Sequence, residues 1–439
     1  MTVTDTQNSA ALSAQSNDPT FANVFQELKW RGYVHVSTDE AELEKHLSEG
    51  SVTYYCGFDP TASSLHLGHL VQLLVMRRLQ LAGHKPLGLV GGATGLIGDP
   101  RQTAERVLNP LDVVEQWVES LRGQIERFLS FEGENAARMV NNLDWTGQMS
   151  ALEFLRDIGK NFRVGTMIKK DIVAKRLESS EGISYTEFSY QILQGLDYLE
   201  LFRRHECTLQ SGGSDQWGNL TSGTDLIRKV TGERVHALGT PLITNSDGTK
   251  FGKSEGNAIW LDPELCSPYA FYQFWLNQSD KDVVDRLKIF TFRTREEIAA
   301  LQAQVAERPF AREAQKTLAF DVTALVHGVE ATEQVIAASQ ALFGGGELGS
   351  IDAATVNAVI SELKVADVEA GVGIVELLVS TGLSASNSEA RRTIKEGGAY
   401  VNNVKVTDAD AVFGPDEALN GSVFLVRRGK KNLAAAKLV

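Results

Sequence analysis

The sequence predicts an α/β protein, in which a parallel sheet covered by helices is followed by an α-helical segment and a small α+β unit. Between about residues 51 and 243, short apolar strand-like runs alternate with amphipathic helical stretches, and glycines stand at the joins. This alternation is typical of a parallel sheet with helices on its faces. After residue 263 glycines become sparse and helical periodicity dominates, and from residue 371 short helices are followed by short strands.

These changes of pattern divide the chain into five expected regions. They are a disordered polar tail (1–22), the parallel-sheet domain (23–265), a helical domain (266–345), a linker (346–370) and a compact C-terminal domain (371–439). A length of 439 residues, with 43% hydrophobic and 23% charged residues, is that of a globular protein with several domains and ample material for their cores.

Composition argues against several classes of protein. The three cysteines lie far apart and form no CxxC pair, which argues against a zinc ribbon or a disulfide framework and favours a reducing, cytoplasmic location. No apolar run approaches the roughly 20 residues of a membrane helix. The first residues also lack the basic start and apolar run of a signal peptide. We therefore expect no membrane partner.

Charge is unevenly distributed along the chain. The whole chain carries a net charge of −13, but residues 371–439 contain nine Lys/Arg and seven Asp/Glu. A basic C-terminal unit on an acidic body indicates a nucleic-acid or surface partner for that unit.

The most informative segment joins the first strand of the sheet to a helix. A β-favouring run at residues 52–55 breaks at Gly57 and Pro60, and an apolar helix is expected to start near residue 67. His66 and His69, three residues apart, are then expected on one face of the first helical turn. A helix N-terminus attracts phosphate, and imidazoles add hydrogen-bond donors. The segment therefore predicts a nucleotide site.

Two glycine-containing loops follow buried strands. The loop at 91–100 has four glycines that let the backbone approach a ligand, but it is neither a Walker A nor a GxGxxG sequence, so a tight turn is an equal alternative. Asp99 in this loop suits either a ligand or a helix cap. In the second loop, at 210–219, the Asp215 carboxylate can accept hydrogen bonds from two vicinal ribose hydroxyls. An ordinary turn has a similar composition, so this remains an alternative.

A helix starting at Ser184 carries a polar stripe. Ser184 and Glu187 match a capping box, and the helix is expected to run to about residue 204. Tyr190, Gln194 and Asp197 share one stripe beside apolar residues, which indicates a small polar ligand. The alternative is a solvated helix face.

A cationic loop lies at residues 249–254. Lys250 and Lys253 stand three residues apart across a glycine, so the loop can close over a polyphosphate and stabilise charge on a leaving group. The alternative is a solvated basic loop.

Together these segments resemble the bacterial-type tyrosyl-tRNA synthetases, a family of class I aminoacyl-tRNA synthetases. The sequence HLGH at 66–69 is similar to the family's HIGH motif, and KFGKS at 250–254 matches its KMSKS motif. The segments YCGFDPT (55–61), GATG (92–95), 190–197 and GSDQWGN (213–219) occur in the family's order. The C-terminal region resembles the ribosomal S4-type RNA-binding module. The resemblance extends from about residue 23 to 439.

The resemblance implies a Rossmann-like catalytic domain, an α-helical domain on the anticodon-binding side and a C-terminal RNA-binding domain. It implies that the enzyme forms tyrosyl-adenylate from L-tyrosine and ATP with Mg²⁺, and then transfers the tyrosyl group to tRNA(Tyr). No tightly bound metal or organic cofactor is expected. A homodimer is implied by the family alone, and DNA is not an expected partner.

The resemblance also implies roles for individual residues. The residues expected to act in catalysis are Thr61, His66, His69, Lys250, Lys253 and Ser254. Those expected to bind tyrosine are Tyr55, Asp99, Tyr190, Gln194, Asp197, Gln210 and Gln216, with Tyr55 and Asp197 on the phenol. Those expected to bind ATP are Gly57, Asp59, His66, His69, Arg106, Gly213, Asp215, Lys250 and Lys253. Those expected to bind RNA are Arg391, Arg392, Lys395, Arg427, Arg428, Lys430 and Lys431.

The sequence departs from the family pattern at one place. The family usually has a lysine a few residues after the equivalent of Asp99, and this chain has none before Arg106. Arg101 is the available cation, but the resemblance does not assign it that role.

Three alternatives of other kinds remain at this point. A tryptophanyl-tRNA synthetase shares the loops but should lack the S4-type module and the phenol pair. A small-molecule nucleotidyltransferase would lack an RNA module. A non-catalytic RNA-binding protein can share the same scaffold, since a fold does not prove an activity.

Overall fold

The computed structural model describes residues 12, 14–100, 108–180, 182–254, 257–344, 353–361, 363–429 and 432–439, with the backbone alone at a few of them. The chain forms two compact units. The first contains Met1–Leu265 and Gln278–Leu318, and the second contains Cys266–Asn277 and Ala319–Val439. The expected helical domain at 266–345 is therefore divided between the two units.

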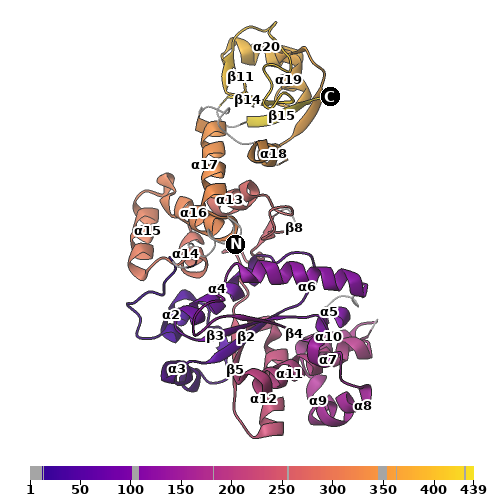
Figure 1. Cartoon of the computed structure of the whole chain (residues 1–439). Helices are drawn as coiled ribbons and strands as arrows, with labels where there is room; N and C mark the ends of the chain where they lie inside the picture. Colours follow the sequence, from indigo (N-terminus) through magenta and orange to yellow (C-terminus); the bar gives the residue numbers. More distant parts are fainter. Residues whose placement is uncertain are drawn as a thin grey trace. The chain divides into compact units, whose positions relative to one another are not determined.

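The first unit is built on a six-stranded sheet, as predicted for a Rossmann-like fold (Figure 1). Its order is β1 (Val36–Ser37), β6 (His236–Thr240), β5 (Cys207–Gly213), β2 (Thr53–Phe58), β3 (Lys85–Val90) and β4 (Arg138–Asn141). All neighbours pair in parallel except β1, which is antiparallel to β6 at the edge. The direction of winding reverses between β2 and β5. Ligands of such sheets bind beyond the carboxyl ends of the strands at this reversal.

Helices of the first unit pack on this sheet and flank it. They are α2 (Val24–Arg31), α3 (Glu40–Glu49), α4 (Leu67–Leu81), α5 (Thr94–Ile97), α6 (Leu111–Glu126), α7 (Leu143–Thr146), α8 (Ala151–Glu153), α9 (Val164–Met167), α10 (Asp171–Glu178), α11 (Tyr185–His205), α12 (Trp217–Thr231), α14 (Val283–Phe290) and α15 (Arg295–Glu307). Helix α4 is buried over most of its length, which explains its apolar composition. Tyr55 on β2 and Leu196 and Leu199 on α11 belong to one buried apolar cluster, so the sheet and α11 share a core.

Helix α11 begins and ends close to the predicted residues, but its predicted capping box is only half formed. The Ser184 hydroxyl accepts a hydrogen bond from the backbone N–H of Glu187 at 3.3 Å. The Glu187 carboxylate instead accepts two hydrogen bonds from Arg176, at 3.0 and 2.8 Å. Both side chains of this pair are buried, so Glu187 connects α11 to α10 instead of closing the box.

The second unit combines helices with a five-stranded sheet. Its helices are α13 (Pro268–Leu276), α17 (Val329–Gly344), α18 (Ala353–Ser361), α19 (Ile374–Ser380), α20 (Asn387–Lys395) and most of α16 (Glu313–His327). The sheet order is β12 (Val404–Val406), β11 (Ala399–Val401), β14 (Val423–Arg428), β15 (Asn432–Leu438) and β9 (Val365–Val368), and a separate pair joins β10 (Val372–Gly373) to β13 (Val412–Phe413). Strand β9 lies in the expected linker but pairs in parallel with β15, so the C-terminal sheet begins earlier than residue 371.

The described part of the N-terminal segment differs from the predicted disordered tail. Asn17 Nδ2 donates to the Arg78 carbonyl oxygen at 2.9 Å, and Asp18 Oδ2 accepts from the backbone N–H of Arg295 at 2.6 Å. Asp18 is buried. Hydrogen bonds hold this segment on the first unit, together with the Phe21 ring, which lies 5.4 Å from the Trp30 ring and under the Arg295 guanidinium.

No helix among the described residues is both long enough and apolar enough to cross a membrane.

Candidate active site

A cavity of about 470 Å³ lies where β2 and β5 end. Its wall includes most of the residues predicted to bind tyrosine or ATP: Tyr55, Gly57, Asp59, Thr61, His66, His69, Asp99, Tyr190, Gln194, Asp197, Gln210, Gly213, Asp215 and Gln216. These residues come from segments separated by up to 161 positions in the sequence. The fold therefore brings the predicted residues together at the reversal of the sheet.

One end of the cavity, here called the buried end, is formed by Tyr55, Asp197 and Gln210. Tyr55 and Gln210 are opposite each other on neighbouring strands, and all three side chains are at most 2% exposed. Within the described part of the chain, neither the Tyr55 hydroxyl nor Gln210 Oε1 has a hydrogen-bond partner. A buried polar group without a partner is costly, so these two atoms indicate a polar ligand group.

Two side chains hold Asp197 in place. Asn142 Nδ2 donates to Asp197 Oδ2 at 3.0 Å, and Trp145 Nε1 donates to Oδ1 at 2.9 Å. Burial raises the pKa of Asp197 to about 7, although these two hydrogen bonds lower it. The carboxyl group is therefore oriented before any ligand arrives, and it titrates near neutral pH.

Asp59 lies between the buried end and the histidines. Its Oδ1 accepts from Thr94 Oγ1 at 2.6 Å, and its Oδ2 accepts from the Tyr190 hydroxyl at 2.6 Å. Asn142 Nδ2 also donates to Thr94 Oγ1, at 3.0 Å. Residue 91 must be glycine, because a Cβ atom there would lie 2.1 Å from Asp59 Oδ1.

A third carboxylate, Asp99, is held by amides. Gln216 Nε2 donates to Asp99 Oδ2 at 3.0 Å, and Asn219 Nδ2 donates to Oδ1 at 3.2 Å. Burial raises the pKa of Tyr190 well above its usual value, and Asp59 and Asp99 raise it further, so this phenol stays protonated. An ammonium group placed among these oxygens would find acceptors from several directions.

His66 and His69 form the other end of the cavity, here called the histidine end. His66 is the N-cap of α4 and not, as predicted, part of its first turn. His66 Nδ1 accepts from the Gly68 N–H at 3.0 Å, and His69 Nδ1 accepts from the His66 N–H at 3.2 Å. The rings stack with centroids 4.0 Å apart. Accepting at Nδ1 places the proton of a neutral ring on Nε2, the tautomer that can donate to a phosphate oxygen. Burial, with His66 beside it, lowers the pKa of His69 well below its usual value.

The segment carrying Lys250 forms a loop beside this end. The backbone N–H of Asn245 donates to the Thr249 carbonyl oxygen at 2.9 Å, and that of Phe251 donates to the Ile243 carbonyl oxygen at 3.2 Å. The loop continues into β7 (Lys253–Ser254), which pairs with β8 (Asn257–Ala258). Phe251 lines the cavity, so Lys250 adjoins its wall.

Comparison with known proteins identifies the family. Residues 47–344 match the model for class I tRNA synthetases of the tryptophan and tyrosine types, which does not separate the two. Residues 356–436 match the model for the C-terminal domain of tyrosine–tRNA ligases. The tyrosine–tRNA ligases of Leifsonia xyli subsp. xyli and Streptomyces griseus subsp. griseus are 66% and 63% identical to this chain. The matches cover 96% and 95% of this chain and 96% and 99% of those proteins. The chain belongs to the tyrosine–tRNA ligase family.

Solved structures agree with this membership. The C-terminally truncated mitochondrial tyrosyl-tRNA synthetase of Aspergillus nidulans is 29% identical, with a TM-score of 0.67 over 74% of this chain and 95% of that one. A tryptophanyl-tRNA synthetase from Encephalitozoon cuniculi shares the fold, with a TM-score of 0.53 at 14% identity over 75% of this chain and 96% of that one. The fold alone therefore does not distinguish the two amino acids, and the C-terminal domain and the high-identity relatives do.

Four residues that hold the predicted site residues in place were not themselves predicted from the sequence. Asn142 and Trp145 hold Asp197, Thr94 holds Asp59, and Asn219 holds Asp99. Asn142 follows β4, and polar residues just beyond a parallel strand are a usable signal, because they lie at the ligand-binding edge of the sheet.

Some predicted residues cannot be placed. Arg101, Arg106, Lys430 and Lys431 lie outside the described residues, and only the backbone is described at Lys253 and Ser254. Among the described residues, no group of three or more His, Cys, Asp and Glu side chains is arranged to hold a metal ion.

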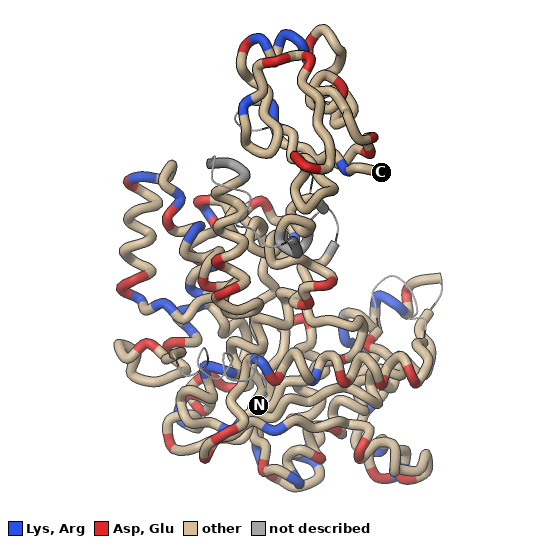
Figure 2. Tube along the Cα trace, turned by 45° about the horizontal axis from the view of Figure 1, so that its top comes forward, with Lys and Arg blue, Asp and Glu red and all other residues tan. Residues whose placement is uncertain are grey.

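The predicted RNA-binding residues of the second unit differ in their solvent exposure and in their contacts with other side chains. Arg391, Arg392 and Lys395 on α20 are exposed, and Arg391 Nη1 lies 3.8 Å from Oδ1 of the exposed Asp410. Arg428 Nη2 instead lies 2.8 Å from Glu389 Oε1, and the Arg427 guanidinium lies over the Tyr400 ring, 4.0 Å from its centroid. Lys and Arg alternate with Asp and Glu along much of the chain (Figure 2). Helix α20 therefore presents three exposed cations on the surface of this unit.

Proposed function

We propose that this chain is a tyrosine–tRNA ligase. It activates L-tyrosine with ATP, forming tyrosyl-adenylate and pyrophosphate, and then transfers the tyrosyl group to the 3′ end of tRNA(Tyr). The observation that carries this proposal is the buried end of the cavity. There the Tyr55 hydroxyl, the Asp197 carboxylate and Gln210 Oε1 surround a space suited to one phenol group.

The geometry supports binding of tyrosine along the cavity. With the phenol at Tyr55 and Asp197, the ammonium group is held by Asp99, Tyr190 and Gln194, and Gln216 orients Asp99. Phenylalanine is rejected because it leaves buried polar atoms without partners. Tyrosyl enzymes are the standard example of such rejection, at about 10⁵-fold, so this magnitude is a known property of the family.

In the first step a tyrosine carboxylate oxygen attacks the α-phosphorus of ATP, and the bond from this phosphorus to the bridging oxygen breaks. The carboxylate is already ionised, so the site needs no general base. It has to position the reactants and to stabilise negative charge that moves onto pyrophosphate. Thr61 and His66 serve the γ-phosphate side through donated hydrogen bonds, and Lys250 and Lys253, with Ser254, close on the pyrophosphate.

The remaining site residues serve adenosine. Asp215 accepts from the ribose hydroxyls, His69 supports the ribose side, and Asp59 lies near the adenosine. Gly57 and Gly213 let the backbone approach the nucleotide, and Arg106 serves its phosphates. Magnesium enters with ATP and is bound mainly through the phosphates.

Amino-acid-dependent exchange of pyrophosphate into ATP tests the proposed activation step. Exchange should depend on tyrosine and be near background with tryptophan and phenylalanine. Exchange that depends on tryptophan would support the tryptophanyl alternative. If none of the three amino acids supports exchange, the chain is not an amino-acid-activating enzyme.

We also propose that α20 contacts tRNA. A double substitution Arg391→Glu and Arg392→Glu should raise the KM for tRNA and reduce the salt dependence of binding by roughly one logarithmic slope unit per lost phosphate contact. Tyrosine-dependent exchange should be unchanged. The double substitution Lys364→Glu and Lys437→Glu reverses the same number of exposed charges outside this surface. Equal effects of the two changes would contradict a specific role for α20.

A homodimer is the proposed assembly, acting in the cytoplasm. Consecutive elements of the first unit present apolar side chains that are half or more exposed: Leu152, Leu155, Val164, Leu177 and Tyr185. Exposed apolar side chains that gather in one patch are typical of an interface. Sedimentation velocity should show a dimer that Tyr185→Asp weakens, and a monomeric native protein would contradict this proposal.

A further inference from the structure

Helix α14 contacts the base of the Lys250 loop. Arg286 Nη2 donates to the Thr244 carbonyl oxygen at 2.7 Å and lies 3.4 Å from Asn245 Oδ1. Asp282, the residue before α14, accepts from the Ser246 N–H at 3.0 Å and from the Ser246 hydroxyl at 3.1 Å. The start of the loop is therefore attached to one end of α14.

The same arginine contacts the centre of the KFGKS segment. The Arg286 guanidinium lies over the Phe251 ring, 4.3 Å from its centroid. Phe290, which is on the same helix as Arg286, has its ring centroid 5.6 Å from that of Phe251. Arg286 is 4% exposed, and burial lowers its pKa, although the carboxylates of Asp282 and Asp285 oppose this shift. A buried cation over an aromatic face is a stronger contact than an exposed one. Phe251 directly adjoins Lys250, so this contact restrains the position of the lysine.

The far side of the loop is attached to the histidine end. The Ile259 N–H donates to the Gly252 carbonyl oxygen at 3.0 Å, and the Leu67 N–H at the start of α4 donates to the Ile259 carbonyl oxygen at 3.1 Å. The Trp260 ring lies 6.0 Å from the His66 ring. The loop is thus held between α14 on one side and the first turn of α4 on the other.

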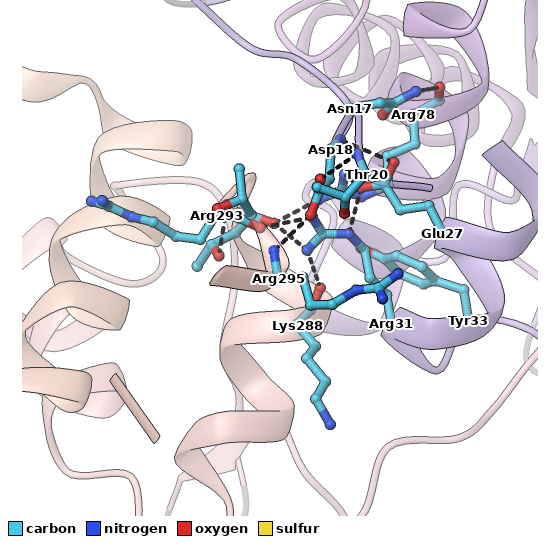
Figure 3. Close-up of polar contacts among 12 residues, drawn as sticks. Asn17, Asp18, Thr20, Glu27, Arg31, Tyr33, Arg78, Lys288, Arg293 and Arg295 are labelled. Carbon is cyan, nitrogen blue, oxygen red and sulfur yellow. Dashed lines mark hydrogen bonds and ion pairs between the residues drawn. The ribbon is translucent and has the colours of Figure 1, made fainter. Parts of the chain in front are cut away.

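A buried charged cluster joins α14 to the same histidine helix (Figure 3). Glu27 Oε1 accepts from Arg31 Nε and from Arg78 Nη1, both at 2.8 Å, and Arg78 belongs to α4. Arg31 Nη1 donates to the Lys288 carbonyl oxygen at 2.9 Å, and Arg78 Nη2 donates to that of Thr291 at 2.6 Å. These carbonyl groups lie at the C-terminal end of α14, where they lack partners within the helix.

The cluster is closed on its other sides as well. Arg31 Nη2 donates to the Arg293 carbonyl oxygen at 2.7 Å, and the Tyr33 hydroxyl donates to that of Ile289. Glu27, Arg31 and Arg78 are each at most 1% exposed. Cations at a helix C-terminus also interact favourably with its dipole. Helix α14 is consequently fixed relative to α4, so Arg286 stands at a set distance from the histidines.

We propose that Arg286 is a positioning residue for adenylate formation: it holds Phe251 so that Lys250 reaches the pyrophosphate while His66 contacts the same phosphates. This inference rests on the proposed function. It predicts that loss of Arg286 leaves tyrosine binding intact, because the buried end lies elsewhere. It also predicts a slower chemical step, because the loop spends less time in the position that stabilises the transition state.

The test compares Arg286→Met with a control, Lys288→Met. The control also removes a cation from α14, but Lys288 Nζ lies 3.2 Å from Asp285 Oδ1 and not at the loop. Arg286→Met should slow single-turnover adenylate formation by about 10- to 100-fold, with tyrosine affinity within about twofold of native. Arg286→Lys should restore part of the rate. Hydrogen exchange of backbone amides at 243–254 should accelerate in Arg286→Met but not in Lys288→Met.

A double-mutant cycle separates positioning from general destabilisation. Phe251→Leu should slow adenylate formation to a similar extent, and adding Arg286→Met to it should slow the reaction little further. Independent, multiplicative effects would overturn the inference, as would a native rate in Arg286→Met. If Arg286→Met does not fold, Arg286→Lys and Phe251→Leu carry the same test. Absence of tyrosine-dependent exchange in the native protein would instead overturn the proposed function.

Discussion

The buried end of the cavity and the loop at its histidine end are held in place by different means. At the buried end, Asp197 is held by two neutral donors that are themselves part of the packed core. At the other end, Lys250 belongs to a loop that adjacent elements hold at its margins. The first arrangement suits recognition of a ligand group, such as a phenol, that takes no part in the bond changes of the reaction. The second suits charge that appears only in the transition state, since a loop can follow it.

The largest effect that would sharpen this comparison is expected from His66→Ala. Adenylate formation should slow by about 10²- to 10³-fold, because the proposed donor to the ATP phosphates is lost, while tyrosine affinity barely changes. Single-turnover kinetics and equilibrium dialysis with tyrosine measure the two quantities. His66→Asn keeps an N-cap acceptor for the Gly68 N–H and thus separates loss of the cap from loss of the phosphate donor. A parallel loss of tyrosine affinity would show that the two ends are not independent.

A smaller effect, confined to the opposite end, is expected from Tyr55→Phe. The preference for tyrosine over phenylalanine, measured as the ratio of kcat/KM values, should fall by about 10- to 100-fold, because one polar partner of the phenol is removed. The rate with saturating tyrosine should change much less. Tyr198→Phe is the matched control, since the Tyr198 hydroxyl donates to the His236 carbonyl oxygen at 2.7 Å and does not line the cavity. Equal loss of preference in both variants would show that loss of a buried hydroxyl in this core, and not loss of a contact with the phenol, is responsible.

The smallest effect concerns stability and depends on pH. The pKa of Asp197 is raised to about 7 in the folded protein, so its ionisation opposes folding as pH rises from about 4 towards 7. The melting temperature of Asp197→Asn relative to native should therefore be higher at pH 8 than at pH 5. Thermal unfolding at the two pH values measures this difference. A difference that does not change with pH would show that the carboxyl group titrates normally.

The parallel sheet, the histidine segment and the stripe on α11 were predictable because each is a local pattern of apolar period, glycine and polar side chains. All seven residues predicted to bind tyrosine line one cavity, since parallel strands end at one edge of a sheet. Asn142 and Trp145 were not predictable in the same way. They lie in a stretch without strong periodicity, and their role depends on β4 pairing beside β3.

Other differences arise where tertiary contacts outweigh local signals. Glu187 has the spacing of a capping box, but a buried Arg176 binds its carboxylate more favourably than a backbone N–H. Asp18 lies in a segment of low hydrophobicity, yet the backbone N–H groups of Arg295 and Thr20 satisfy its carboxylate. Burial tends to raise the pKa of Asp18, and these hydrogen bonds outweigh that tendency and lower it. No local pattern in the sequence reports such distant partners.

The hydrogen bonds around Asp59 also have a direction. Asn142 donates to Asp197 and to Thr94, Thr94 donates onward to Asp59, and Tyr190 donates to Asp59 from the other side. Every one of these bonds ends on a carboxylate or leads to one, so Asp59 and Asp197 are held as hydrogen-bond acceptors in this stretch of the cavity wall. A ligand that fits these carboxylates must present protons to them. L-tyrosine does so with its phenol and ammonium groups, and the ribose of ATP does so with its hydroxyls.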